Sequence, residues 1–350
     1  MSAPGYVFLY TEPPAFAGEP SGMNYARSWN APRLDYFGVG YEDYERVVSV
    51  EMGDVYAIEA DVDTAAVAET VTDSGYAGAG SYRDYDLFSR SDLRRVLAVR
   101  ADALLFGVGE RAGADVRAMA DARAGGLARF HERDAVHAAL TRRTGSRPWL
   151  YYGFGGFLRG DITRHVDGQT TGISVDDDHV YTYYTYLFDD AAVVDRAAIR
   201  TQLRDWVARE ERPGPFGPDT TTADIDVDGR FVAVENRHPR GEFLDDGATT
   251  PMPQITWGFE DGDGRLTVRH EAGDSADASA LFFRLRPPDR RQETSATLDD
   301  PVQFADEYDT VGPGDSVTLD TSGLPTGTDL QMVYSFEDRS ARVFRYEVTP

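Results

Sequence analysis

The sequence contains neither lysine nor cysteine. Without cysteine the chain can form no disulfide, no thiolate metal site and no cysteine nucleophile. Without lysine it has no P-loop lysine, no Schiff-base lysine and no kinase-type strand lysine. Several large classes of enzyme are therefore excluded before any motif is considered.

Positive charge is also scarce. All 35 basic residues are arginine, and 60 Asp and Glu residues bring the net charge to −25. Such self-repulsion is screened only at high ionic strength, where the Debye length falls to about 3 Å at 1 M salt. The composition therefore predicts an acidic, halophilic protein. It also excludes nucleic acid as a partner, because this charge repels a phosphate backbone.

Long apolar runs are missing as well, and none is long enough to cross a membrane. The N-terminus shows neither the charged region nor the apolar region of a signal peptide. Taken literally, this predicts a cytoplasmic protein. The alternative is that Met1 replaces a leader or lipid-anchor signal and that the protein is extracellular or attached to the cell envelope. The C-terminal region, described below, favours this alternative.

The chain is long enough for two domains. Residues 1–236 are predicted to form a duplicated α+β domain with an extended N-terminal lead-in. A strand, a helix and a hairpin follow one another twice, in repeats of about 47–145 and 149–236. We expect the two sheets or half-sheets of the repeats to pack together.

Turn residues at 237–253 predict a linker, and no helix is expected beyond it. Six strand-like segments separated by turn clusters occupy residues 254–350. This spacing predicts an antiparallel, immunoglobulin-like β-sandwich. The predicted fold class of the whole chain is therefore α+β.

Five segments of the C-terminal region carry a resemblance. They are Trp257-Gly258-Phe259-Glu260, residues 266–275, Gly314-Asp315-Ser316-Val317, Met332-Val333-Tyr334-Ser335 and Ser340-Ala341-Arg342-Val343-Phe344. This region resembles the β-sandwich domain of haloarchaeal type IV pilin-like secreted proteins. The preceding 200 residues resemble haloarchaeal proteins of unknown function, which are often secreted or lipid-anchored. The resemblance implies an envelope-located module. It does not imply a filament, because the apolar N-terminal helix through which pilins polymerise is missing.

The sharpest local motif consists of acidic residues around one glycine. Asp224, Asp226 and Asp228 alternate before Gly229, and Glu235 follows six residues later. This spacing fits the calcium-loop formula, in which these four carboxylates would bind Ca²⁺.

The surroundings of the motif favour a different structure. Prolines lie on both sides of it, whereas a calcium loop of this kind lies between helices. The alternative is a hairpin that turns at Asp228-Gly229 and pairs Ile225 with Val232, with the acids facing solvent. We favour the hairpin, and Ca²⁺ is then the only candidate cofactor.

Aromatic residues gather in two predicted strands. Tyr151 and Tyr152 belong to the first strand, and Tyr181 and Tyr183 to the second. One interpretation is that they fill the core between the repeats. The other is that one face docks a protein or a glycan at the cell surface.

No residues stand out as a catalytic set. The six histidines are scattered, and the Gly-Asp-Ser turns at 273–275 and 314–316 lack the strand-to-helix setting of a nucleophilic serine. We therefore favour a non-enzymatic structural or recognition protein of the cell envelope of an extreme halophile. The alternatives are a carboxylate-dependent hydrolase acting on a glycan and a cytoplasmic binding module. The sequence leaves the oligomeric state open.

Overall fold

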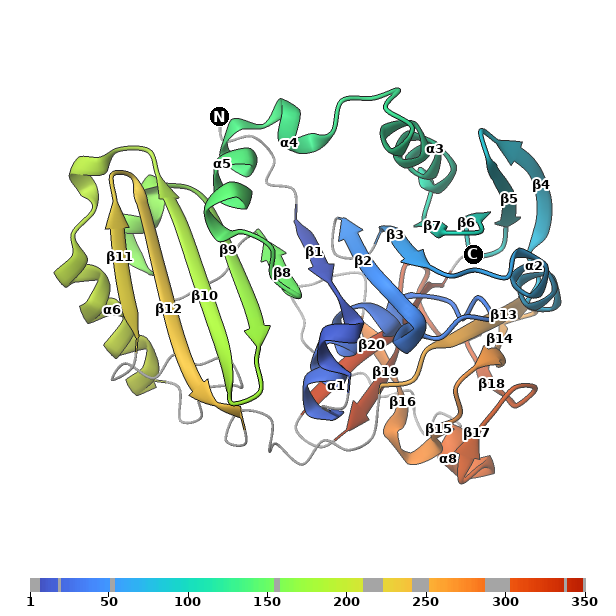
Figure 1. Cartoon of the computed structure of the whole chain (residues 1–350). Coiled ribbons are helices and arrows are strands. Elements are labelled where there is room, and N and C mark those ends of the chain that lie inside the picture. Colours follow the sequence, from blue (N-terminus) through green and yellow to red (C-terminus); the bar gives the residue numbers. More distant parts are fainter. Residues whose placement is uncertain are drawn as a thin grey trace.

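A computed structural model describes residues 7–17, 20–50, 54–153, 158–209, 223–240, 252–286, 303–336 and 339–348. It confirms a mixed α+β chain that is rich in strands. One large antiparallel sheet occupies the N-terminal part, and smaller sheets form the C-terminal part (Figure 1).

The large sheet has twelve strands in the order β11-β12-β10-β9-β8-β1-β2-β3-β7-β6-β5-β4. Its first seven strands in the chain are β1 (Phe8–Thr11), β2 (Tyr44–Val50), β3 (Val55–Ala60), β4 (Ala77–Tyr82), β5 (Tyr85–Arg90), β6 (Arg95–Arg100) and β7 (Ala103–Val108). The other five are β8 (Trp149–Tyr152), β9 (Val166–Val175), β10 (His179–Phe188), β11 (Asp224–Asp228) and β12 (Phe231–Pro239).

The N-terminal segment is not an extended lead-in, so this prediction was wrong. It contains helix α1 (Pro20–Asn30) and strand β1, which pairs with β2 on one side and β8 on the other. The signal was weak because β1 has only four residues, and it is held in place by pairing with strands distant in sequence.

The two halves of the sheet share an order of strands. In the first half β3 leads into helix α2 (Thr64–Asp73), and the chain returns so that β7 pairs with β3. In the second half β10 leads into helix α6 (Arg196–Arg209), and β12 returns to pair with β10. The halves join edge to edge through β1 and β8, so the repeats form two halves of one sheet and not two separate sheets.

Helices cover both faces of the sheet. Helices α2 and α6 pack on one face, with Val67 and Val71 of α2 and Ile199 and Leu203 of α6 in the cores. Helices α3 (Ala112–Arg123) and α5 (Ala135–Thr144) lie on the opposite face, and the short α4 (Phe130–Arg133) precedes α5.

The helix caps follow ordinary rules, with one correction. Asp63 accepts hydrogen bonds from the first turn of α2. The sequence pattern predicts Asp189 and Asp190 as caps of α6, but Asp195 caps it, accepting from the backbone N–H groups of Ala197 and Ala198.

The C-terminal part is an antiparallel sandwich. One sheet contains β13 (Ile255–Gly262), β14 (Arg265–Gly273) and β18 (Ser316–Asp320), and the other contains β16 (Leu281–Arg286), β19 (Asp329–Phe336) and β20 (Arg339–Glu347). A small pair, β15 (Ala276–Asp277) and β17 (Thr310–Val311), and a one-turn helix α8 (Phe304–Glu307) complete it. The expectation that no helix follows the predicted linker was therefore wrong. Trp257, Phe304 and Met332 lie in the core between the sheets.

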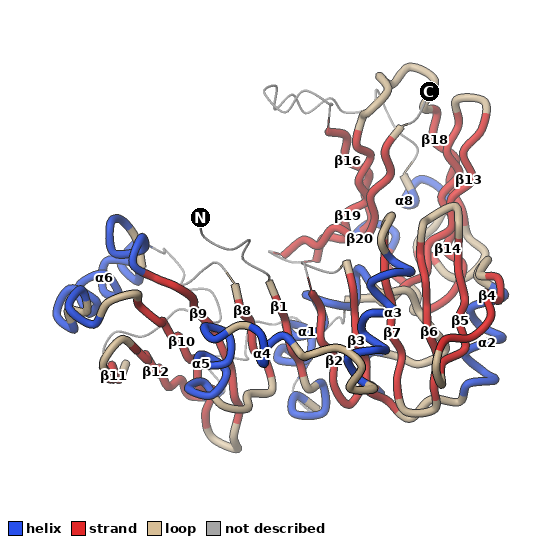
Figure 2. Tube along the Cα trace, turned by 90° about the horizontal axis from the view of Figure 1, so that it is seen from above, coloured by secondary structure: helices blue, strands red, loops and turns tan. Residues whose placement is uncertain are grey.

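The sandwich lies against the half of the sheet that contains β2 to β7, while the half from β8 to β12 extends away from it (Figure 2). Part of the predicted linker is structured. Arg237 to Pro239 belong to β12, and Met252 is buried in the sandwich core. Residues 241–251 of the predicted linker lie outside the described residues.

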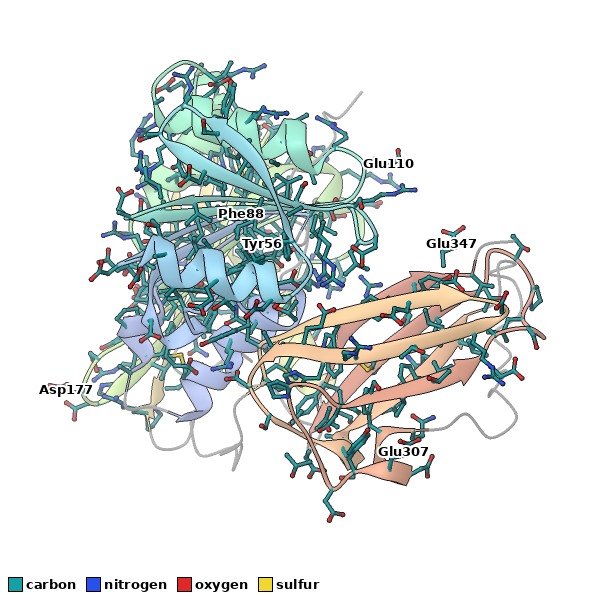
Figure 3. All side chains as sticks on the ribbon, turned by 90° about the vertical axis from the view of Figure 1, so that its right-hand side faces the viewer. Tyr56, Phe88, Glu110, Asp177, Glu307 and Glu347 are labelled. Atoms are coloured by element: carbon teal, nitrogen blue, oxygen red, sulfur yellow. The ribbon has the colours of Figure 1, made fainter. Side chains whose placement is uncertain are left out.

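Charged side chains cover the exterior of both parts. Figure 3 shows Glu110, Asp177, Glu307 and Glu347 projecting outward, while Tyr56 lies in the interior. Across the described residues, no helix has the length and apolar character that crossing a membrane would require.

Candidate functional site

One face of the sheet is open along β9, β10 and β12, beyond the part that α5 covers. The strand register places Tyr183 between Gly172 and Glu235, and Tyr181 between Ser174 and Arg237. Because residues paired across strands share a face, these side chains form one surface. Helix α6 packs on the opposite face, through Tyr184 and Tyr186.

Two tyrosines and one arginine form the centre of this surface, which we call the tyrosine platform (Arg147, Tyr181 and Tyr183). The ring centroids of Tyr181 and Tyr183 lie 6.4 Å apart, with an angle of 23° between the planes. The guanidinium carbon of Arg147 lies 3.8 Å from the centroid of the Tyr183 ring. This distance is within the range of a cation–π contact, which holds the guanidinium against the Tyr183 ring.

Local geometry explains the position of Arg147. Helix α5 ends at Thr144. The next residue, Gly145, has a φ of 71° and turns the chain back toward β8. Arg147 then lies over Gly172, and a Cβ atom on that glycine would come within 3.2 Å of the Arg147 Cγ. The missing side chain of Gly172 therefore makes room for the arginine.

A hydrogen-bonded rim holds Tyr181. Its hydroxyl donates to Asp176 over 2.9 Å, and Asp176 also accepts from the backbone N–H groups of Asp178 and His179. These backbone hydrogen bonds, with that of Tyr181, lower the pKa of Asp176. The carboxylate conversely raises the pKa of Tyr181. Arg237 donates to His179 Nδ1 over 3.1 Å beside them.

The other two predicted docking residues lie elsewhere. Tyr151 is on the opposite face, where its ring lies 6.4 Å from that of Trp149 and 6.3 Å from that of Trp29. Tyr152 packs against His137 with 4.7 Å between centroids, and burial raises its pKa to about 12. The four predicted tyrosines therefore form no common surface, and only Tyr181 and Tyr183 are neighbours.

The acidic motif forms a hairpin and not a helix-flanked loop. Asp224, Asp226 and Asp228 lie on β11, and Glu235 on β12 faces Asp224. The expected register was wrong, because Ile225 pairs with Val234 instead of Val232. The two loop residues are Gly229 and Arg230, and only Gly229 has a positive φ, 58°. This matches a type II′ turn, which favours glycine at its first central position.

Arginines reach the carboxylates of this hairpin. Arg143 of α5 forms an ion pair with Asp226 and lies 3.6 Å from Asp228, and Arg196 lies 3.9 Å from Asp224. Among the residues described, no group of three or more metal-ligating side chains is close enough to hold an ion.

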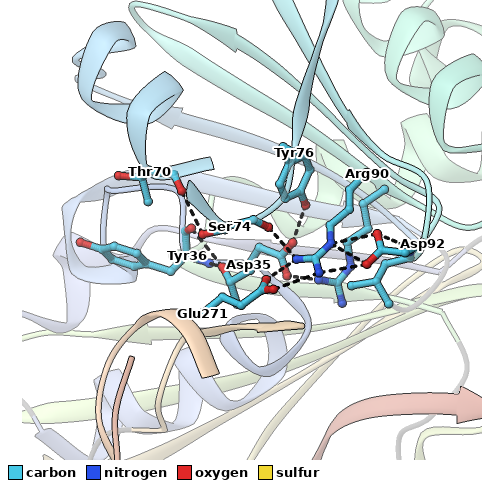
Figure 4. A network of polar contacts seen from close by, with 11 residues as sticks. Asp35, Tyr36, Thr70, Ser74, Tyr76, Arg90, Asp92 and Glu271 are labelled. Carbon is cyan, nitrogen blue, oxygen red and sulfur yellow. Dashed lines mark hydrogen bonds and ion pairs between the residues drawn. The ribbon is translucent and has the colours of Figure 1, made fainter. Parts of the chain in front are cut away.

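A second polar site joins the sheet to the sandwich, and sequence reasoning missed it. Its centre is Arg90, which is 5% exposed and donates to Glu271 of β14 (Figure 4). Arg90 also donates to the Ser74 carbonyl over 2.7 Å and to Asp92 over 2.9 Å. Burial raises the pKa of Glu271 despite this arginine.

Further contacts extend this junction. The Asp35 carboxylate accepts from Tyr76 and Arg95, and its backbone carbonyl accepts from Gln254 Nε2 over 2.7 Å. Gln254 Nε2 also donates to the Tyr44 hydroxyl over 2.9 Å. Buried polar groups thus meet partners from both parts of the chain.

Arg27 completes the junction on the side of α1. It is buried and donates to Asp274, to Glu42 and to the backbone carbonyl of Met252. We call Arg27, Arg90, Glu271 and Asp274 the junction ion pairs.

Two glycines allow the close approach at the junction. A Cβ on Gly258 would lie 2.0 Å from Glu271 Oε1, so the carboxylate occupies space that a side chain would fill. Gly273 has a φ of 106°, and a Cβ there would meet the Gln254 carbonyl at 2.2 Å. No local pattern signalled this site, because Arg90 and Glu271 are 181 residues apart.

Among the described residues, two carboxylates have raised pKa values, the property expected of a general acid. They are Asp54 and Glu271, and burial is the main cause in both. Neither lies beside a carboxylate whose pKa is lowered. The pKa of Asp54 is affected by Arg33 and Asp115, and Glu271 is paired with Arg90 at the junction. The described residues therefore offer no pair of carboxylates with opposite pKa shifts of the kind that the hydrolase alternative requires.

Comparisons with known proteins add a distant structural likeness. No family model matches the chain, and no curated protein matches it. Two solved structures of TP0453 are similar over 71% of this chain. Crystal form I has a TM-score of 0.43 at 7% identity over 95% of its own length, and form III has 0.39 at 8% over 96%.

Proposed function

We propose that the chain is a non-enzymatic recognition protein of the cell envelope of an extreme halophile. The observation that carries the proposal is the tyrosine platform. Its rings and guanidinium are fixed by the sheet, by Gly172 and by Asp176, yet they remain partly exposed. A surface that is both ordered and accessible is suited to binding, because little conformational entropy is lost when a ligand docks.

The charge of the chain supports the location. An excess of 25 acidic charges with arginine as the only strong base is suited to molar salt. The resemblance of the sandwich to haloarchaeal secreted proteins favours the outside of the cell.

The topology supports the finer description of the fold. We infer that the two halves of the large sheet are copies of one strand-helix-hairpin unit. Both halves, β1 to β7 and β8 to β12, place the helix after the third strand, on the same face, and both return the last strand to pair with that third strand. On this interpretation, the open face of the second half is the place where the copies differ in function.

Binding to isolated envelopes tests the function. Purified protein is mixed with cell envelopes of a halophilic archaeon in about 3 M salt, where charges are screened beyond about 2 Å, and the pellet is assayed. We expect saturable co-sedimentation that Tyr181→Ala weakens and that phospholipid vesicles do not reproduce. Absence of saturable binding to envelopes would contradict the proposed function.

A further inference from the structure

Arg147 is unusual in its surroundings. The chain has 60 acidic residues for 35 arginines. Several half-buried arginines of the large sheet and its helices contact a carboxylate, for example Arg95 with Asp35 and Arg100 with Asp102. Arg147, in contrast, has no carboxylate partner among the residues that the structure describes.

The guanidinium of Arg147 is positioned by the Tyr183 ring, but no carboxylate among the described residues neutralises its charge. Its inner nitrogen Nε is buried without a hydrogen-bond partner, whereas its two terminal nitrogens make no hydrogen bond within the described residues and are not among the buried atoms that lack a partner. One side of the guanidinium lies on the Tyr183 ring, 3.8 Å from its centroid. The terminal N–H groups therefore remain available as a fork that matches a carboxylate or sulfate.

The neighbouring groups suit a sugar better than a protein. Tyr181 offers a partly exposed ring beside the fork, and Asp176, His179 and Arg237 offer donors and acceptors around it. A stable protein interface needs an apolar, well-packed centre and about 800 Å² from each partner. Two rings within a charged rim do not provide such a centre. A pyranose presents C–H groups to an aromatic ring and hydroxyl groups to the rim.

Salt removes the main objection to an anionic ligand. The net charge of −25 would repel an anion from a distance. At about 1 M salt the Debye length is about 3 Å, so only groups in contact act on the ligand. A two-pronged hydrogen bond to Arg147 persists under these conditions, since a contact pair is screened much less.

We propose that Arg147, Tyr183 and Tyr181 bind an acidic sugar residue of an extracellular polysaccharide. The acidic group, carboxylate or sulfate, lies against the terminal nitrogens of Arg147, and the sugar ring lies against Tyr181. The inference rests on the proposed function and names the class of ligand that the platform takes.

Calorimetric titration in about 2 M NaCl tests this inference, where the Debye length is about 2 Å. The probes are a trimer of galacturonic acid, a sulfated galactose trimer and the neutral galactose trimer. We expect one or both acidic trimers to bind at least about tenfold more tightly than the neutral one, because a charged hydrogen bond is lost with the latter. Carboxylate and sulfate are distinguished by which acidic trimer binds more tightly. Equal affinity for all three, or no binding of either acidic trimer, would overturn the proposal.

Three variants assign the binding to the platform. Arg147→Gln should weaken the acidic trimer about tenfold or more and leave the neutral trimer unchanged. Arg147→Lys should keep only part of the wild-type affinity for the acidic trimer, because an ammonium keeps the positive charge but cannot form the two-pronged hydrogen bond. Arg142→Gln removes an exposed arginine from the nearby end of α5 and serves as the matched control. Circular dichroism should show the same fold in all of them.

The outcomes also separate this inference from the proposed function. If Arg147→Gln binds envelopes and acidic trimers as the wild type does, the inference is wrong while the function stands. If the wild type binds no envelope, the function itself fails. Loss of acidic-trimer binding in Arg147→Gln, with unchanged behaviour of Arg142→Gln, supports both.

Discussion

Two sets of ion pairs in this molecule differ in burial. The junction ion pairs lie between the sheet and the sandwich, and the arginines Arg27 and Arg90 are 3% and 5% exposed. A second set crosses the surface of the sheet, where each charge contacts the next. This surface ribbon consists of Glu12, Arg46, Glu59, Arg123, Asp102, Arg100 and Asp84.

The difference shows that a charge-rich chain uses its charges in two ways. Removing one partner of a buried pair leaves an unpaired charge in a poorly solvated place, which typically costs 3–5 kcal/mol. Removing one member of an exposed network costs little, because water replaces the lost contact. We therefore expect the junction to set the stability of the two-part structure, and the ribbon to respond mainly to salt.

The largest effect is expected at Arg90. Arg90→Gln should lower the free energy of unfolding by about 3 kcal/mol, because Glu271 then loses its partner in a buried position. Urea unfolding in molar salt measures the change. Arg94→Gln is the control, since Arg94 pairs with Glu110 on the open surface. If both variants lost a similarly small free energy of unfolding, the ion pair of Arg90 with Glu271 would not stabilise the contact between the sheet and the sandwich.

A slightly smaller effect is expected at Gly258. Gly258→Ala should cost about 1–3 kcal/mol, because its methyl group would occupy the space of the Glu271 carboxylate. The same substitution should cost much less in the Arg90→Gln background, where the carboxylate no longer needs that position. Equal costs in the two backgrounds, measured as a double-mutant cycle, would show that the glycine acts independently of the ion pair.

Acid should weaken the same region through His270. This residue is fully buried on β14, and its Nε2 donates to the Asp274 carbonyl over 2.8 Å. Burial lowers its pKa, although the carboxylates of Asp274 and Asp315 act in the opposite direction. Trp257 lies against its ring at 5.5 Å between centroids.

The sign of the pH effect follows from this lowered pKa. The unfolded chain binds a proton at higher pH than the folded chain, so stability is complete above the unfolded value of about 6.5 and falls as the pH drops below it. His270→Gln keeps the donor to Asp274 and should flatten the decline of the melting temperature between pH 7 and 5. Burial also lowers the pKa of His137, which should account for any slope that remains. A slope identical to that of the wild type would exclude His270 as the cause.

The smallest effect is expected in the surface ribbon. Arg123 bridges Glu59 at 3.2 Å and Asp102 at 3.3 Å. Arg123→Gln should cost at most about 1 kcal/mol, and the cost should shrink as salt rises. Melting temperatures of the variant and the wild type, compared across a salt series, measure it. A cost that grows with salt would contradict the screening argument.

Much of the fold could be predicted because its signals are local. The alternation of the sandwich strands and the apolar run of β7 coincide with the predicted segments within a few residues. The alternating pattern from Tyr82 to Phe88 predicts a single strand, but this segment contains the end of β4, a turn at Arg83 and the start of β5. Arg83 has a φ of 52°, which non-glycine residues seldom adopt, so a turn at this position could not be predicted from residue type.

The sites depended on contacts that no local pattern contains. Alternation alone places Tyr181 and Tyr183 on one face, but the approach of Arg147 requires the register of β8, β9 and β10. The junction is more remote still, since Arg27 and Asp274 are separated by 247 positions. Such pairs follow from the tertiary structure and not from spacing along the chain.

The most direct test of the central claim is the position of the protein on living cells. Intact cells of the native halophile, kept in their growth salt, are treated with a salt-tolerant protease, and the chain is detected with an antibody. We predict that the protein is cleaved without lysis while a cytoplasmic marker survives. Protection of the chain until the cells are lysed would contradict an envelope location and favour a cytoplasmic binding module.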